Sequence, residues 1–83
     1  MPTLIPISRT VFLSEVNETP SDYRIFEAGI EAMGRVDKFL SMNDNVERVG
    51  ETTVVRLCDT TTRQQLVKAS AIVCQNSDKF GSN

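Results

Sequence analysis

The side chains that most often perform catalysis are absent from this sequence or stand without partners. The chain of 83 residues has no histidine, so it lacks the usual general base near neutral pH and the Ser-His and Cys-His pairs that activate a nucleophile. Cys58 and Cys74 therefore have no evident group to hold them as thiolates. The four glycines form no phosphate-binding loop, because neither a GxGxxG nor a GKS/T string occurs.

Paired carboxylates are the remaining source of acid–base chemistry. Glu27 and Glu31, or Asp37 and Asp44, are the pairs that folding could bring together. Glycosidase-type catalysis needs such a pair at the bottom of a cleft, and a chain this short rarely has enough material to build one. We interpret these residues as solvated charges and predict that the protein is not an enzyme. An enzyme that acts only inside a larger complex is the least favoured hypothesis.

Metal and cofactor sites are not expected either. The two cysteines match no zinc pattern, and without histidine a metal site would need carboxylates to complete it. The run 43–47 is rich in oxygen ligands but lacks the alternating spacing of a calcium loop, so we interpret it as a turn. Cys58 and Cys74 are predicted to be unpaired thiols that serve as small apolar side chains. The sequence thus predicts no metal, no cofactor and no small-molecule substrate.

Length and composition indicate one domain. The hydrophobic content of 40% and the charged content of 24% are close to globular averages, and no repeat or linker divides the chain. We expect a single domain over residues 1–83, with residues 76–83 as a flexible tail. Only five residues are aromatic, so the core must consist mainly of aliphatic side chains. Self-association is a natural supplement to such a core, and we expect a homodimer.

The charge pattern disfavours nucleic acid and membranes as partners. The net charge is −2, and the basic residues are spread singly along the chain, whereas phosphate binding depends on concentrated positive charge. No apolar run approaches the roughly 20 residues that span a bilayer, and the N-terminus does not resemble a secretion signal. We expect a cytoplasmic protein.

The first half of the chain predicts a strand followed by a helix. Residues 3–16 carry large apolar side chains, many of them β-branched, at both odd-numbered and even-numbered positions, and this favours a strand. Because proline cannot donate a backbone hydrogen bond, either the strand begins after Pro6 or the stretch around Pro6 lies on a sheet edge. Thr19–Asp22 then supplies a hydroxyl cap, a proline at the first helical position and an acid in the first turn. We expect a helix over about residues 20–40, ending at the Asn-rich run 42–45, where asparagine accepts the left-handed conformation of a C-terminal cap.

Along this helix, large apolar residues recur at spacings of three and four, and we expect this stripe to pack on the sheet: Phe26, Ile30, Met33 and Val36. Truncation of Phe26 or Ile30 to alanine is then predicted to cost about 2–5 kcal/mol. Gly29 and Gly34 suggest close packing against another backbone, or are merely tolerated.

The second half predicts further strands. Residues 46–58 form either one bent strand with a bulge at Gly50 or a short hairpin that turns there. Residues 65–74 alternate apolar and mixed positions after the polar turn 59–63, which favours a strand paired with residues 52–58. A helix is the alternative for this last run, because Thr61 with Gln64 and Thr62 with Gln65 match the capping-box pattern.

In the strand reading, Leu57 pairs near Val67 and Val55 pairs near Ala69, which places both apolar rows against the helix. The predicted fold class is α+β: one amphipathic helix packed on a small, mostly antiparallel sheet of three to four strands in the order β-α-β-β, with a second helix as the alternative for the last element.

These observations favour a non-catalytic protein-binding module, a small inhibitor or adaptor that acts through a protein–protein interface. Small proteins of this profile often come from phages or mobile elements and inhibit host machinery, so a viral protein is the expected class. The apolar residues outnumber those that one helix on one sheet face can cover, so the second sheet face is predicted to meet a partner. Together with Leu4, the expected partner-binding residues on or beside that face are Phe12, Arg56, Arg63, Leu66, Lys68 and Ile72.

The alternative is a small nucleic-acid-binding domain that uses basic residues on the outer face of the sheet. Arg56 and Lys68 are expected to be cross-strand neighbours there, with Arg48 and Arg63 close by. The same face lacks the aromatic platform on which bases stack, which weighs against this alternative.

Overall fold

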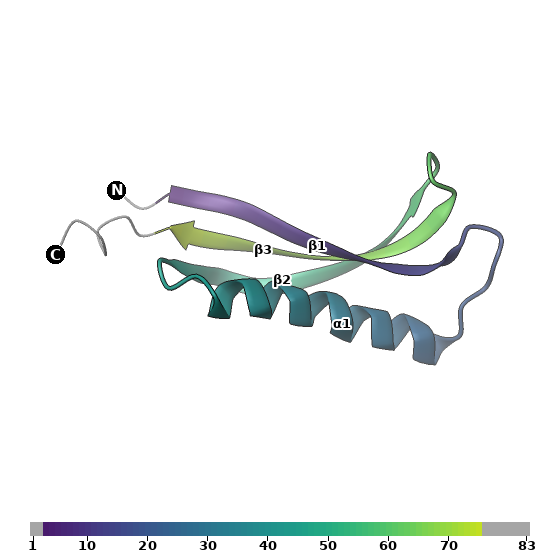
Figure 1. Cartoon of the computed structure of the whole chain (residues 1–83), viewed down its shortest axis with the longest axis horizontal. Coiled ribbons are helices and arrows are strands. Elements are labelled where there is room, and N and C mark those ends of the chain that lie inside the picture. The colour runs from purple at the N-terminus through teal and green to yellow at the C-terminus, as the bar shows by residue number, and fades with distance from the viewer. Residues whose placement is uncertain (1–2, 76–83) are drawn as a thin grey trace, which may run out of the picture.

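The first half of the chain forms a long strand and the helix that crosses back over it (Figure 1). The computed structural model describes residues 3–75; the predicted flexible tail, residues 76–83, lies outside the described residues. Strand β1 spans Thr3–Glu15, and helix α1 spans Asp22–Ser41. As predicted, Pro6 lies on an edge strand, where its missing donor is tolerated.

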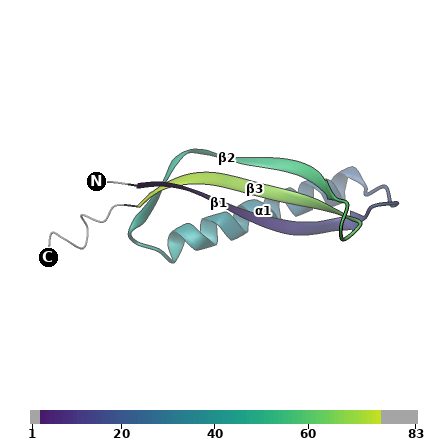
Figure 2. The same cartoon turned by 90° about the horizontal axis from the view of Figure 1, so that it is seen from above.

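The second half forms two long strands, β2 at Val46–Asp59 and β3 at Gln64–Gln75, that complete an antiparallel sheet of three strands in the order β1-β3-β2. Figure 2 shows β3 between the two edge strands. The predicted α+β class and the β-α-β-β order are therefore confirmed.

The helical alternative for the last element is wrong, because β3 is the central strand and its alternate side chains fill the core. Val67, Ala69, Ala71 and Val73 are all buried. The polar residues before it form a turn instead of a helix cap: the Asp59 carboxylate accepts hydrogen bonds from the backbone N–H groups of Thr61 and Thr62.

The pairing of β2 with β3 differs by one residue from the predicted register. Leu57 pairs with Leu66, and Val55 pairs with Lys68. Because side chains alternate across a strand, this shift moves Val55 and Leu57 to the face of the sheet opposite α1. Three residues of β2, Gly50 to Thr52, bulge out of the ladder between Val49 and Thr53. One bent strand with a bulge at Gly50, which has a φ of +82°, is thus confirmed over the hairpin.

The core lies between α1 and one face of β1 and β3. Its helical side is made of small or β-branched residues, Ala28, Ala32 and Val36, each with 0% exposure. Against them pack Val11 and Leu13 of β1 and the buried row of β3, with Ile7, Ile25 and Leu40 at the margins. The alanines let the helix backbone approach the sheet closely, which is why this face is selected.

The predicted helix face is wrong for most of its members. Phe26 is 69% exposed and Ile30 is 49% exposed, whereas only Val36 of the predicted stripe is buried. The buried face is turned from the prediction by roughly a quarter of a turn. The prediction chose the helix face with the largest apolar side chains. In the structure the smallest side chains of the helix contact the sheet, and the largest lie beside this contact. The core penalty predicted for Phe26 therefore does not apply.

The helix ends are also set by other residues than predicted. The N-cap is Ser21, whose hydroxyl accepts a hydrogen bond from the backbone N–H of Arg24, so Thr19 is not the cap. At the other end Met42 keeps a right-handed conformation, and no asparagine adopts a left-handed one in the described residues. Asn43 instead donates from its side chain to the Phe39 carbonyl, a second hydrogen bond to an oxygen that also accepts from the backbone N–H of Met42.

Cys58 and Cys74 are free thiols at opposite ends of the sheet. Cys58 is opposite Gln65, nine positions along β3 from Cys74, which corresponds to roughly 30 Å. A disulfide needs Cα atoms within about 7 Å. The two residues are therefore unable to cross-link within one copy of this fold.

The packing of α1 leads to opposite effects for two neighbouring substitutions. Ala32→Leu should destabilise the protein by about 1–3 kcal/mol, because the added atoms have no space between helix and sheet. Gly34→Ala should stabilise it by about 0.5–1 kcal/mol, because a Cβ there meets nothing within 4 Å and alanine favours the helix. Urea unfolding would measure both, and equal effects would contradict the assigned helix face.

The cysteines give a second prediction. Reductant should leave the melting temperature unchanged, since no disulfide is present to remove. A thiol reagent should modify the exposed Cys58 faster than the half-buried Cys74, as followed by mass spectrometry of peptides. Faster labelling of Cys74 would contradict the assignment of the two strand faces.

Candidate functional site

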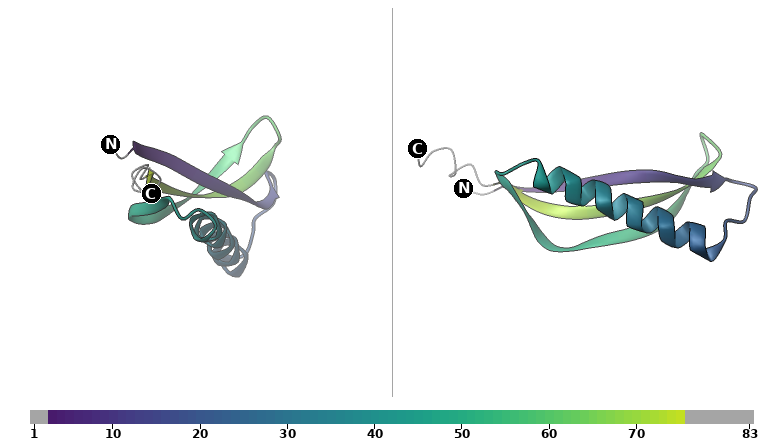
Figure 3. Two further views of the ribbon diagram at one scale, coloured as in Figure 1. Left: turned by 60° about the vertical axis from the view of Figure 1, so that its left-hand side comes forward. Right: turned by 60° about the horizontal axis from the view of Figure 1, so that its bottom comes forward.

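The face of the sheet opposite α1, called here the outer face, is the largest surface that the described elements leave uncovered. The end-on view of Figure 3 shows α1 on one side of the three strands and no other described element on the opposite side. Burial of Val67 and Ala69 against the helix fixes Leu66 and Lys68 on the outer face, and the register extends this assignment to β1 and β2.

Two apolar rows cross the outer face near its ends. At one end Phe12 of β1 pairs with Leu66 of β3, which pairs in turn with Leu57 of β2. At the other end the pairing joins Pro6, Ile72 and Val49, and Leu4 follows on β1. The exposed fractions are 44% for Phe12, 42% for Ile72 and 64% for Leu4. Such rows are unusual on a sheet face that only meets water.

The middle of the outer face is polar. Ser8, Ser70 and Thr53 form one row, and Thr10, Lys68 and Val55 form the next. Lys68 is half-buried and makes no ion pair with described residues. The outer face therefore presents one positive charge between two apolar ends.

The structure brings together four of the six predicted partner-binding residues: Phe12, Leu66, Lys68 and Ile72 all lie on the outer face. Arg56 does not join them, because it pairs with the buried Val67 and so lies on the helix side, where it donates to the Gln65 side chain. Arg63 lies in the turn between β2 and β3 with a φ of +57°. The expected cross-strand pair of Arg56 with Lys68 is thus wrong, as a consequence of the one-residue register shift.

A second uncovered apolar surface was missed by sequence reasoning. It runs along the side of α1 that faces β2 and is called here the helix stripe; its members are Tyr23, Phe26, Ile30 and Met33. Val54, 39% exposed, continues it onto β2, because its side chain lies beside Gly29, where a Cβ would be 3.8 Å from Val54 Cγ1. The i, i+4, i+8 spacing of Ala28, Ala32 and Val36 is the signal that could have revealed it.

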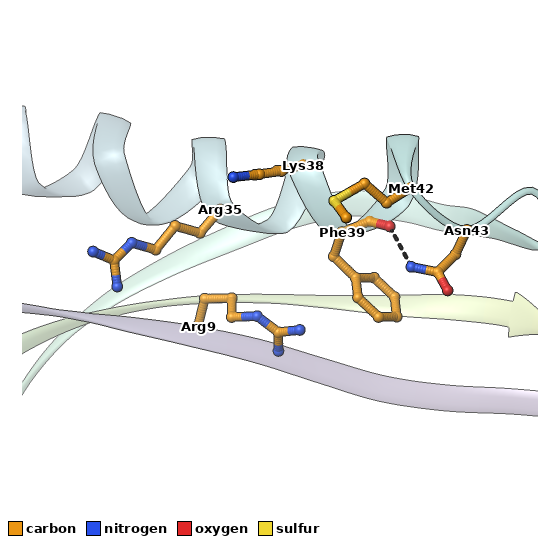
Figure 4. A pocket seen from close by; sticks show the side chains of 6 residues that line it. All are labelled: Arg9, Arg35, Lys38, Phe39, Met42 and Asn43. Atoms are coloured by element: carbon orange, nitrogen blue, oxygen red, sulfur yellow. Dashed lines mark hydrogen bonds between the residues drawn. The ribbon is translucent and has the colours of Figure 1, made fainter.

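A small pocket of about 440 Å³ lies between β1 and the last two turns of α1. Figure 4 shows its lining residues: Arg9, Arg35, Lys38, Phe39, Met42 and Asn43. Two of its three cations already hold the helix to β1. Arg35 pairs with Glu31 at 3.5 Å and donates to the Thr10 carbonyl. The Arg9 guanidinium lies 5.1 Å from the centre of the Phe39 ring.

The third cation, Lys38, lies in the last turn of α1, where a positive charge stabilises the negative end of the helix dipole. All three basic side chains therefore have a structural role. The lining of the pocket contains no carboxylate and no thiol.

Within residues 3–75, no three His, Cys, Asp or Glu side chains come close enough together to bind a metal ion. In the same residues, no helix combines the length and the apolar character that crossing a membrane requires. The charged side chains instead form local pairs: Arg24 with Glu27 at 3.1 Å along the helix, and Arg48 of β2 with Asp37 of α1 at 3.9 Å.

Comparison with known proteins adds no relative to this picture. No protein-family model matches the chain, and no curated protein or solved structure shows significant similarity to it. The two uncovered apolar surfaces of the fold are therefore the features from which its function is inferred.

Proposed function

We propose that this protein is a non-catalytic binding module that holds another protein on the outer face of its sheet, as a small inhibitor or adaptor does. The observation that carries the proposal is the pair of apolar rows around Phe12 and Ile72 on a sheet face that no described element covers. Natural antiparallel sheets usually present polar side chains on a face that stays in water. An apolar patch of a few hundred Å² marks a binding surface in most monomeric proteins.

The layout of the outer face indicates what its partner offers. Phe12 with Leu66 at one end, and Ile72 with Leu4 at the other, are the expected apolar anchors. Between them Lys68 presents a single positive charge, which favours an acidic group at the centre of the partner's surface. Lys68 lies on the central strand, so its charge stands in the interior of this surface and not at its edge.

The nucleic-acid alternative receives less support from this geometry. Its four basic residues do not share a surface: Arg48 and Arg56 lie on the helix side of β2, Arg63 lies in the turn, and only Lys68 lies on the outer face. Phe12 is the one aromatic side chain on that face among the described residues. Single-strand binding relies on several stacked aromatics within a positive groove.

The proposal predicts that Phe12→Asp and Ile72→Asp each weaken partner binding by about 2 kcal/mol or more, roughly thirtyfold, because each buries a charge at an apolar anchor. Affinity capture from the native host with wild-type bait would identify the partner, and calorimetry with the purified partner would measure the loss. Both residues are more than two-fifths exposed, so the fold should survive with unchanged circular dichroism.

The matched control is Phe26→Asp, which places the same charge at an exposed aromatic position on the helix stripe. It should leave the affinity of a single outer face for a partner with one binding site within about threefold of wild type. If Phe26→Asp abolishes capture while Phe12→Asp does not, the partner binds the helix side and the proposal is wrong. If Phe12→Asp and Ile72→Asp unfold the protein, both residues belong to its core.

A further inference from the structure

The two edges of the sheet are protected very differently. On β1, Pro6 interrupts the row of donors, and two arginines of α1 occupy backbone acceptors: Arg24 donates to the Phe12 carbonyl at 2.6 Å, and Arg35 donates to the Thr10 carbonyl at 3.3 Å. Proline and covering side chains are the usual means by which proteins keep an edge strand from pairing with another chain.

The β2 edge lacks these features along the segment that follows its bulge. Residues 53–59 pair with β3 without interruption and contain no proline. The two arginines of β2 make their hydrogen bonds to side chains, Arg48 to Thr52 and Arg56 to Gln65, and not to the backbone of their own strand. Near its start this segment also exposes large apolar side chains, with 39% of Val54 and 47% of Val55 accessible.

The helix stripe lies beside this same edge. Asp37 of α1 reaches Arg48 of β2, which shows that this side of the helix faces β2. Gly29, midway between Phe26 and Met33 along the stripe, lies against Val54. The middle of the helix stripe therefore lies beside Val54, so an axis at the neighbouring Val55 passes close to the middle of both the stripe and the run 53–57.

A shared centre is the condition for an interface between two identical chains, since a two-fold axis must pass through the middle of every contact it generates. If β2 pairs antiparallel with β2 of a second copy, the axis is perpendicular to the sheet. Both helices then lie on the same face of a six-stranded sheet, and their stripes face one another. Because each helix lies over β1 and β3, the two helix axes would be about four strand spacings, roughly 19 Å, apart.

Ordinary helix packing brings axes to within about 8–10 Å, so long side chains are needed to close this gap. Phe26 and Met33 are long, whereas the alanines on the sheet side of the same helix are not. The exposed parts of the helix stripe and Val54 amount to roughly 500 Å² per copy, given the areas typical of aromatic and aliphatic side chains. With the strand backbone added, the interface approaches the roughly 800 Å² per partner of stable complexes.

The charges also fit this arrangement. In a ladder centred on Val55, Val55 pairs with Val55 of the second copy, Val54 pairs with Arg56, and Thr53 pairs with Leu57. Among these pairs no two like charges meet, and the central pair joins two β-branched side chains, which suits antiparallel strands. Further out, Glu51 would lie opposite Asp59 of the second copy, so the paired run is limited to residues 53–57.

We propose that the protein forms a two-fold homodimer through antiparallel pairing of β2 around Val55, sealed by the two helix stripes. This interface differs from the outer-face partner site, although the Val55 side chain lies beside Lys68 on the outer face and so borders both. The sequence analysis expected a homodimer because the core is small and aliphatic, and this proposal says which surface forms it.

A charge-swap experiment at the axis tests the dimer directly. Wild type should sediment with twice the chain mass at about 100 μM and dissociate on dilution. Val55→Glu and Val55→Lys should each be monomeric, with dimerisation weakened at least tenfold, because like charges meet at the axis. Mixed in equal amounts, the two variants should form a heterodimer, which native mass spectrometry distinguishes from either homodimer.

A second variant tests the helix stripe, and a third serves as control. Phe26→Asp should also weaken the dimer at least tenfold while circular dichroism stays unchanged, since Phe26 makes little contact within the monomer. Leu4→Asp, at an equally exposed apolar position on β1, should leave the dimer intact. Three results would overturn the proposal: a wild type that stays monomeric at 100 μM, failure of the two Val55 variants to pair, or loss of the dimer in Phe12→Asp but not in Phe26→Asp.

Discussion

The close approach of α1 to the sheet at Ala28 and Ala32 is the constraint on which the rest of the structure depends. Because these alanines and Val36 form the contact, the helix lies low over β1 and β3, and its larger side chains cannot enter the core. A core of small aliphatic residues is thin, and one helix covers one face of the sheet only. Both uncovered apolar surfaces, the outer face and the helix stripe, follow from this packing.

Much of the fold was predictable because its signals are local. The strand at the N-terminus, the helix after Pro20, the bulge at Gly50 and the preference for a strand over residues 65–74 all follow from residue types and their period. The rotation of α1 and the register of β2 were not predictable in the same way. Each is decided by contacts between segments distant in sequence, and a period of apolar residues does not say which of two neighbouring faces is buried.

The residues of the candidate site were predicted correctly where the sequence showed which alternate side chains of a strand point away from the helix. For β1 and β3 the parity was correct, so Phe12, Leu66, Lys68 and Ile72 lie together as expected. For β2 it was inverted, because the turn that follows it pairs Asp59 with Gln64, which sets the ladder one residue away from the predicted register. That one-residue shift moved Arg56 away from Lys68 and removed the basic surface of the nucleic-acid alternative.

The two proposed interfaces reinforce one another through symmetry. A two-fold axis perpendicular to the sheet keeps both outer faces on the same side of a six-stranded sheet, with the helices on the other. Two Lys68-centred surfaces would then point in one direction, a few strand spacings from their common axis. A partner that is itself a dimer, or that carries two acidic apolar segments, would engage both at once, and its second contact would form at a high effective concentration. With both proposed interfaces in place, a small chain would gain an avidity that one thin sheet face does not supply.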